Sequence, residues 1–108
     1  MKKATHKSDR NSVTDFRQIV NIGPSISDDF IRIGIKSPTG LIGQDPLKLY
    51  RKICRTDGRF HDPCVLDCFM SAIDFMNGNR PRKWWDFTDT RKKKYSGAVD
   101  SLRNTYPR

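Results

Sequence analysis

The stretch 15–34, with the sequence DFRQIVNIGPSISDDFIRIG, decides how this chain begins to fold. It contains two amphipathic runs separated by the sharp break Asn21-Ile22-Gly23-Pro24. The second run places its apolar residues at helical spacing on one face: Ile26, Phe30 and Ile33. Asn tolerates a positive φ, Gly adopts it freely, and Pro fits the first turn of a helix. The stretch therefore predicts two helices, over 13–20 and 24–33, joined by a tight turn.

This turn should leave main-chain amides unpaired at the start of the second helix, on Gly23, Ser25 and Ile26. Such amides suit a phosphate oxygen. The turn resembles the helix-hairpin-helix motif of DNA-handling proteins, in which an apolar-Gly-apolar-Gly sequence is often followed by Pro. Ile22, Gly23 and Pro24 match that pattern, and Asn21 stands where the first Gly is usual. The resemblance implies a contact with the DNA phosphate backbone.

A second interpretation is that the turn only connects two helices. The motif often has Lys or Thr just after the Pro, whereas this chain has Ser25, Ile26 and Ser27. Asp28 and Asp29 follow, and carboxylates near a helix start stabilise its dipole but repel DNA. The sequence leaves both interpretations of the turn open.

Length and composition bound the class of protein. The 108 residues suffice for one domain with a modest core, and because Glu is absent, any carboxylate in a site must come from Asp. No apolar run approaches the roughly 18 residues of a membrane span. The basic N-terminus lacks the apolar segment of a signal peptide, so we expect a cytoplasmic protein whose three Cys are reduced thiols.

The net charge of +9 lies mainly at the two ends of the chain. Residues 1–14 carry a net +3 and residues 90–108 a net +5, whereas residues 15–89 carry only +1. We therefore expect a flexible tail over 1–12, a folded domain over 13–89 and a flexible basic tail over 90–108. Basic tails bind nucleic acid in a salt-sensitive way, or they simply keep a chain soluble.

A second turn of the same kind follows at Ile42-Gly43, which lies 20 residues after Ile22-Gly23. Ser37-Pro38 and Asp45-Pro46 each pair a capping side chain with a Pro, which predicts helix starts on both sides of it. Together the two turns predict a compact five-helix domain with tandem helix-hairpin-helix (SAM-like) topology, although a chance recurrence of Ile-Gly would look the same. The resemblance implies that Gly43 takes part in DNA binding.

The predicted helix over 46–56 carries four cations that form one narrow stripe: Lys48, Arg51, Lys52 and Arg55. No acid interrupts the helix, and like charges four residues apart each cost a few tenths of a kcal/mol. An anionic partner would remove that cost, so the stripe indicates a phosphate-backbone surface. The alternative is a solvated face with no ligand.

Two further segments concern the core. Asp62-Pro63 begins a helix to about Asn77 that is apolar nearly all round, which predicts the buried central helix. The aromatic group Trp84, Trp85 and Phe87 follows. We expect these rings to close the core of so small a domain, while the alternative is that they stack on bases beside Arg82 and Lys83.

Residues 15–89 as a whole resemble a small bacterial family labelled pathogenicity locus or mitomycin-resistance-like. The residues that carry the resemblance are Ile22-Gly23-Pro24, Gly34-Ile35, Ser37, Asp45-Pro46-Leu47, Leu49-Tyr50, Cys54, the stretch 62–75 and Trp84-Trp85. The C-terminal domain of the competence regulator TfoX looks like a more distant relative. The resemblance implies an all-α helix-hairpin-helix fold with presumed DNA binding. It brings no enzymatic activity with it, and we expect a protein that is not an enzyme.

Catalytic and metal chemistry find little support. Zinc would accept the ligand types of one cluster, Cys54, His61, Cys64 and Cys68. However, thiols four residues apart on an apolar helix usually pack inward, so we favour buried thiols. Cys64 with His61 lacks a third catalytic member, and the chain has neither a P-loop nor a dinucleotide fingerprint. We expect no cofactor and no small-molecule substrate.

Two hypotheses of function follow from the sequence. The first is a non-enzymatic module that binds the DNA phosphate backbone through the first turn and the cationic stripe, with little sequence preference. The second is a protein-interaction domain in which the turn is only structural, and Asp28, Asp29 and the nearly neutral centre of the chain favour it.

Overall fold

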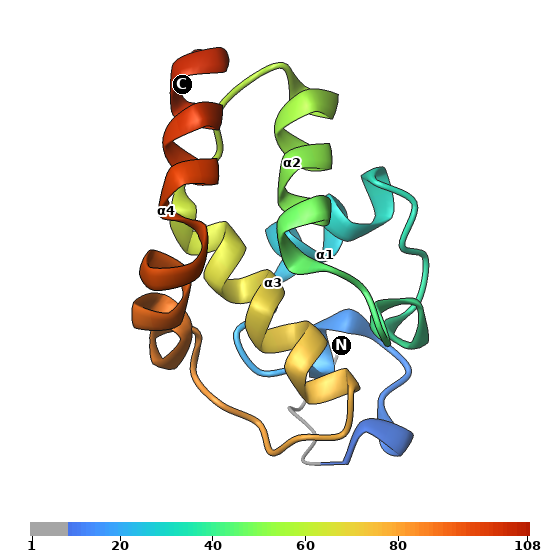
Figure 1. Cartoon of the computed structure of the whole chain (residues 1–108). Coiled ribbons are helices and arrows are strands. Elements are labelled where there is room, and N and C mark those ends of the chain that lie inside the picture. Colours follow the sequence, from blue (N-terminus) through green and yellow to red (C-terminus); the bar gives the residue numbers. More distant parts are fainter. Residues whose placement is uncertain (1–8) are drawn as a thin grey trace.

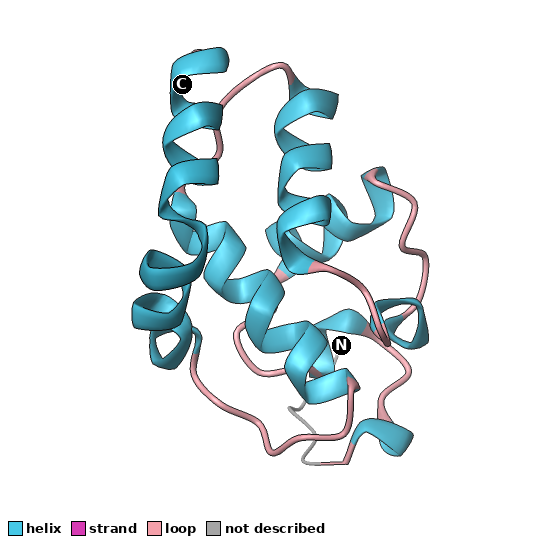
Figure 2. Ribbon diagram, viewed as in Figure 1, coloured by secondary structure: helices cyan, strands magenta, loops and turns pink. Residues whose placement is uncertain are grey.

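A computed structural model describes residues 9–108 of the chain. These residues form helices and loops only, which confirms the all-α class (Figure 2). The four α-helices are α1 (Pro24–Arg32), α2 (Pro46–Asp57), α3 (Pro63–Met76) and α4 (Thr88–Thr105). Four short 3₁₀ turns lie at Arg10–Ser12, Phe16–Gln18, Pro38–Leu41 and Trp84–Phe87.

The helix starts follow the capping signals in the sequence. Pro occupies the first turn of α1, α2 and α3. The Asp45 carboxylate accepts a hydrogen bond from the Leu47 amide (3.0 Å), and the Asp62 carboxylate accepts one from the Cys64 amide (2.8 Å). At its other end α2 stops at Gly58, which adopts the left-handed conformation with φ of 63°.

The predicted count of five helices is not confirmed. The predicted helix over 13–20 is reduced to the 3₁₀ turn Phe16–Gln18, and the short third helix is the 3₁₀ turn Pro38–Leu41. A capping box closes the first of these turns, because Asp15 accepts from the Arg17 amide while Gln18 accepts from the Asp15 amide. These local bonds satisfy the backbone hydrogen-bonding groups within a few residues, so a longer helix does not form.

The core is built around α3, which runs diagonally between α2 and α4 (Figure 1). Leu66, Phe69 and Ala72 of this helix are fully buried, as predicted for the central helix. The Phe30 ring of α1 lies 4.8 Å from the Phe69 ring and 5.1 Å from the Phe16 ring, measured between centroids. Burial of these large apolar side chains is the main stabilising contribution.

The prediction of a flexible tail over 90–108 is wrong, because this segment forms most of α4. Asp67 of α3 is completely buried, and it accepts hydrogen bonds from Arg91 Nε (2.7 Å) and Thr88 Oγ1 (2.8 Å). Val99 is buried against the core. The Phe60 amide also donates to the Pro107 carbonyl (2.7 Å), so contacts fix both ends of α4.

The N-terminal tail was predicted over 1–12, and its first eight residues lie outside the described part of the chain. The rest of it is ordered against the domain. Asp9 caps the turn Arg10–Ser12, and Arg10 donates to the Met76 carbonyl at the end of α3 (2.8 Å). Among the described helices, none has both the length and the apolar character needed to cross a bilayer.

Candidate nucleic-acid interface

The first turn has the backbone that the sequence predicts. Asn21 adopts the left-handed conformation with φ of 72°, Gly23 is the N-cap of α1, and Pro24 is its first residue. Asn21 Nδ2 donates to Ser71 Oγ and to the Arg82 carbonyl, each at 3.1 Å. The turn is therefore fixed to α3 and to the chain before the tryptophans.

The start of α1 is open to an anion. Gly23 has no side chain to act as a cap, and the first turn contains no acid. Within residues 9–108, the amides of Gly23, Ser25 and Ile26 have no hydrogen-bond acceptor. Ser25 is exposed, and Gly23 and Ile26 are half-buried, so this end of α1 lies at the protein surface.

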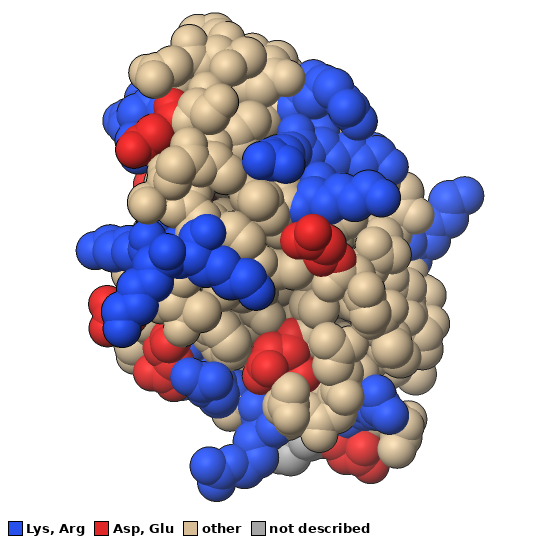
Figure 3. All heavy atoms as spheres, viewed as in Figure 1, with Lys and Arg blue, Asp and Glu red and all other residues tan. Residues whose placement is uncertain are grey.

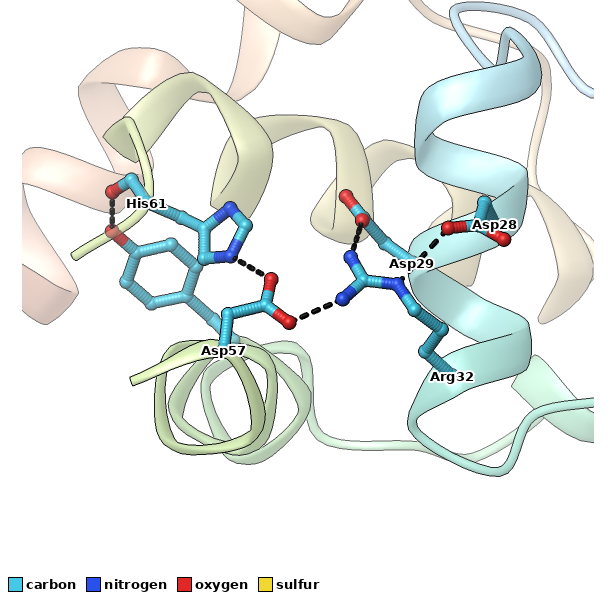
Figure 4. Close-up of polar contacts among 6 residues, drawn as sticks. Asp28, Asp29, Arg32, Asp57 and His61 are labelled. Carbon is cyan, nitrogen blue, oxygen red and sulfur yellow. Dashed lines mark hydrogen bonds and ion pairs between the residues drawn. The ribbon is translucent and has the colours of Figure 1, made fainter. Parts of the chain in front are cut away.

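Asp28 and Asp29 do not close this end of the helix, because both bind Arg32 in the next turn (Figure 4). Arg32 Nε lies 3.0 Å from Asp28, and a terminal nitrogen lies 2.5 Å from Asp29. Arg32 also pairs with Asp57 of α2, whose other oxygen lies 2.7 Å from His61 Nε2. The Arg32 guanidinium holds the pKa of Asp57 below its usual value. Both carboxylates are thus paired with a cation, although the single charge of Arg32 offsets only part of the negative charge of Asp28, Asp29 and Asp57.

The second turn has the predicted shape but lacks an open end. Gly43 is left-handed with φ of 75°, and its amide donates to Asn77 Oδ1 (2.8 Å). The Asp45 side chain accepts from the amides of Leu47 and Lys48. Because the protein's own side chains take these donors, the structure offers no free amide at Gly43 to a phosphate.

The four predicted cations of α2 form one exposed surface, the α2 basic stripe, made of Lys48, Arg51, Lys52 and Arg55. They line a common hollow with Asp45 at its end. No ion pair joins any of the four to a carboxylate of residues 9–108, so their charge is uncompensated.

Most of the other arginines are paired, which sets the stripe apart. Arg17, Arg91 and Arg103 each bind an Asp, namely Asp15, Asp67 and Asp100. Arg91 belongs to the segment predicted as a flexible basic tail over 90–108, whereas the structure turns it inward toward Asp67. Lys92, Lys93 and Lys94 remain exposed on α4. In Figure 3, basic side chains gather over α2 and over the first half of α4, other basic side chains lie along the lower edge, and acidic side chains lie between these groups.

The stripe and the first turn do not form one continuous surface. Lys52 Nζ lies 3.8 Å from where a Cβ on Gly34 would be, so the stripe passes the C-terminal end of α1. The open amides lie at the other end of this nine-residue helix, about 13 Å away at 1.5 Å per residue. The structure therefore gathers the four cations but separates them from Gly23, Ser25 and Ile26.

The aromatic group near residue 85 only partly closes the core. Phe87 is buried, but Trp84 is half-buried and 57% of Trp85 is exposed. Lys83 Nζ lies 5.9 Å from the centroid of the Trp85 ring. The expectation of core closure is thus confirmed for Phe87 and wrong for Trp85, because a 3₁₀ turn directs successive side chains to different sides.

The residues weighed for zinc are not brought together. Cys54 is buried in the core, and His61 uses Nε2 to contact Asp57. No three His, Cys or Asp side chains of residues 9–108 gather as metal ligands would. Burial raises the pKa of all three thiols, and that of Cys68 to about 12. They are therefore neutral thiols packed against the helices.

Comparison with known proteins supports the family resemblance that the sequence suggests. The family model described as pathogenicity locus matches residues 9–93. The chain belongs to the pathogenicity locus family. A curated relative is the mitomycin resistance protein McrB of Streptomyces lavendulae, 39% identical over 84 residues that cover 78% of this chain and 80% of the relative. No solved structure matches this pathogenicity locus protein.

Proposed function

We propose that this protein is a non-enzymatic module that binds the phosphate backbone of DNA with little sequence preference. The observation that carries the proposal is the α2 basic stripe, in which four exposed cations share one hollow without an ion-pair partner among residues 9–108. Lys and Arg contacts to phosphate supply affinity without reading sequence.

Electrostatics support an anionic ligand at the stripe. Arg51 and Arg55, and likewise Lys48 and Lys52, lie four residues apart on α2, where like charges repel. A row of phosphates would replace that repulsion with attraction. Among residues 9–108, Asp45 is the one carboxylate that lines the hollow, and it accepts a hydrogen bond from the Leu47 amide at the helix start.

The open amides of Gly23, Ser25 and Ile26 are proposed as a second phosphate contact, as in a helix-hairpin-helix motif. Support comes from the left-handed Asn21, the absence of a side-chain cap and the absence of acid in the first turn of α1.

The free cysteines support a reducing compartment, and we propose a cytoplasmic location for the protein.

A protein-interaction domain is the second candidate, and the bonds of Asn21 favour it. Its side chain fixes the turn to Ser71 and to the Arg82 carbonyl, which gives the turn a structural purpose without any DNA. In that case the cations of α2 would serve only as a solvated surface or as a site for an acidic partner.

Titration of the full chain with a labelled DNA duplex at several salt concentrations distinguishes DNA binding from a role in protein interaction alone. Four phosphate contacts predict a slope of log affinity against log salt of about −3 to −4. Arg51→Glu should weaken binding to every duplex sequence alike and make the slope shallower by about 1. Lys36→Glu is the matched control, because Lys36 is exposed in the loop after α1 and does not line the hollow of the stripe.

Equal losses from Arg51→Glu and Lys36→Glu would show that net charge, and not the stripe, determines binding. No measurable affinity of the natural chain would remove the DNA proposal. A truncated chain ending at residue 90 is unsuitable for this test, because it would leave the buried Asp67 without Arg91.

A further inference from the structure

We infer that the surface around Trp85 and Lys83 binds single-stranded DNA, with an unpaired base stacked on the Trp85 indole. This inference rests on the proposed function and specifies the form of DNA. It goes beyond backbone contacts, because it requires the bases to be accessible.

Trp85 has the exposure and the neighbour that such a site needs. More than half of its side chain is exposed, whereas most large apolar side chains of the described chain are buried. Lys83 Nζ lies 5.9 Å from its ring centroid, and the Trp84 ring packs against it edge-on, with centroids 5.5 Å apart. An indole beside a cation is the combination that stacks a base and holds the adjoining phosphate.

The backbone that carries Trp84 and Trp85 is fixed to the rest of the protein on both sides. Before the tryptophans, the Arg82 carbonyl accepts from Ser71 Oγ (2.8 Å) and from Asn21 Nδ2 (3.1 Å). After them, Phe87 is buried in the core, and the Arg82 guanidinium lies 4.5 Å from the Phe87 ring centroid. A side chain presented on a fixed backbone loses little entropy when it binds.

A hollow separate from the one that the α2 basic stripe lines lies next to the residues that flank Trp85. It is lined by Arg82 and Phe87 near the tryptophans, by Lys94 and Tyr95 of α4, and by Pro46 at the start of α2. Asp45, the neighbour of Pro46, lies at the end of the hollow that the stripe lines. Arg82 and Lys94 therefore border this hollow beside the aromatic Phe87 and Tyr95, together with one acid, Asp74. Cations next to aromatic side chains are typical of surfaces that bind single-stranded nucleic acid.

A protein partner fits the same residues less well. Among residues 9–108, the three exposed large apolar side chains lie in different segments: Ile31 in α1, Ile42 in the loop after Leu41, and Trp85 in the turn before α4. Protein interfaces bury a contiguous patch, while a single indole flanked by Lys83 suits one stacked ring. The acid directly after Trp85, Asp86, has a carboxylate oxygen 4.0 Å from Arg82 Nε, so its charge is partly offset.

The test compares three ligands on the full chain: a poly-dT strand, an abasic strand with the same number of phosphates, and a duplex. Strands of about 30 nucleotides exceed the 40 Å long axis of the protein. Trp85→Ala should weaken binding of poly-dT by roughly five- to a hundredfold and leave binding of the abasic strand unchanged. Trp85→Phe retains a ring and should retain most of the affinity.

Fluorescence gives a direct readout of stacking. Trp84→Phe leaves Trp85 as the sole tryptophan, and its emission should be quenched by poly-dT but not by the abasic strand. If Trp85→Ala left poly-dT affinity unchanged, or lowered it equally for the abasic strand, the stacking inference would be overturned. If Arg51→Glu then still weakened all three ligands, the proposed function would stand alone. If the natural chain bound none of the ligands, both would fail.

Discussion

The two glycine turns of this protein share a backbone but differ in what they leave exposed. Each has a left-handed residue, Asn21 or Gly43, shortly before a Pro that begins an α-helix. The first turn ends in the N-cap Gly23, and its amides have no acceptor within residues 9–108. The second turn ends in the N-cap Asp45, and Asn77 takes the amide of Gly43.

The difference shows that turn shape and ligand binding are determined by different residues. Left-handed positions and prolines determine the shape, while the N-cap side chain determines whether the helix end is available to an outside anion. In this chain the cations follow the closed turn, and the open turn has few cations of its own. A duplex bound by both would have to contact two separate surfaces.

Replacement of Asn21 by Val should have the largest effect, because it removes the shape of the first turn. A β-branched residue resists a φ of 72°, and both side-chain bonds are lost, so we expect unfolding free energy to fall by about 3 kcal/mol. Asn21→Gly keeps the φ and should cost only about 1 kcal/mol. Equal losses in chemical denaturation would mean that the left-handed backbone carries no strain.

Replacement of Arg32 tests why Asp28 and Asp29 leave the first turn open. Arg32→Gln removes the partner of three carboxylates and should lower stability by about 2 kcal/mol at pH 7. The freed charges should also weaken DNA binding at low salt. Thermal unfolding and a duplex titration measure the two effects.

The pH dependence of the same variant sharpens this test. Arg32 keeps the pKa of Asp57 below the ordinary Asp value of about 3.9. The stabilisation from this pair is therefore fully present above that value and lost as the pH falls below it. Unfolding free energy measured from pH 6 to pH 2 should fall less steeply for Arg32→Gln and for Asp57→Asn than for the natural chain. Identical curves would contradict the pairing.

Removal of the Asp45 cap should open the second turn. Asp45→Ala should destabilise the protein by about 1 kcal/mol and strengthen DNA binding at low salt, because it removes the carboxylate that borders the α2 basic stripe. Asp62→Ala is the matched control, since it removes another N-cap that does not line the stripe. If both variants changed DNA affinity alike, the position of Asp45 would be irrelevant.

The smallest effect is expected from closing the first turn. Gly23 has a φ of −98°, and a Cβ there would meet no atom within 4 Å, so a side chain fits. Gly23→Asp should raise stability by a few tenths of a kcal/mol through capping and should weaken DNA binding. Gly23→Ser caps the helix without adding charge, so it separates the effect of occupying the amides from the effect of a negative charge. Unchanged DNA affinity in both variants would assign the first turn a structural role only.

The parts of the fold that sequence predicts are those set by local chemistry. Asp45-Pro46 and Asp62-Pro63 mark the starts of α2 and α3 because a cap and a proline act within one turn. The sequence of α3 is apolar on nearly all sides, and this property of one segment predicts its burial. The cationic stripe of α2 follows from helical spacing alone, and the structure places its four members together.

The parts that sequence misses depend on distant contacts. The segment 88–105 is mostly polar and buries only Val99, so its pattern suggests a tail. Its position depends on Arg91 binding Asp67, a pair separated by 24 residues. Likewise, the free amides of α1 and the occupied amide of Gly43 look alike in sequence, because Asn77 approaches Gly43 only in the folded chain.

Burial of the thiols has a practical consequence for these experiments. With its pKa raised to about 12, Cys68 has a thiolate fraction on the order of 10⁻⁵ at neutral pH, and Cys54 and Cys64 are shifted in the same direction. Maleimide dyes react with the thiolate, so a cysteine introduced at an exposed position such as Ser101 should be labelled well before the three native ones. Fluorescent probes can thus be attached to the otherwise natural chain.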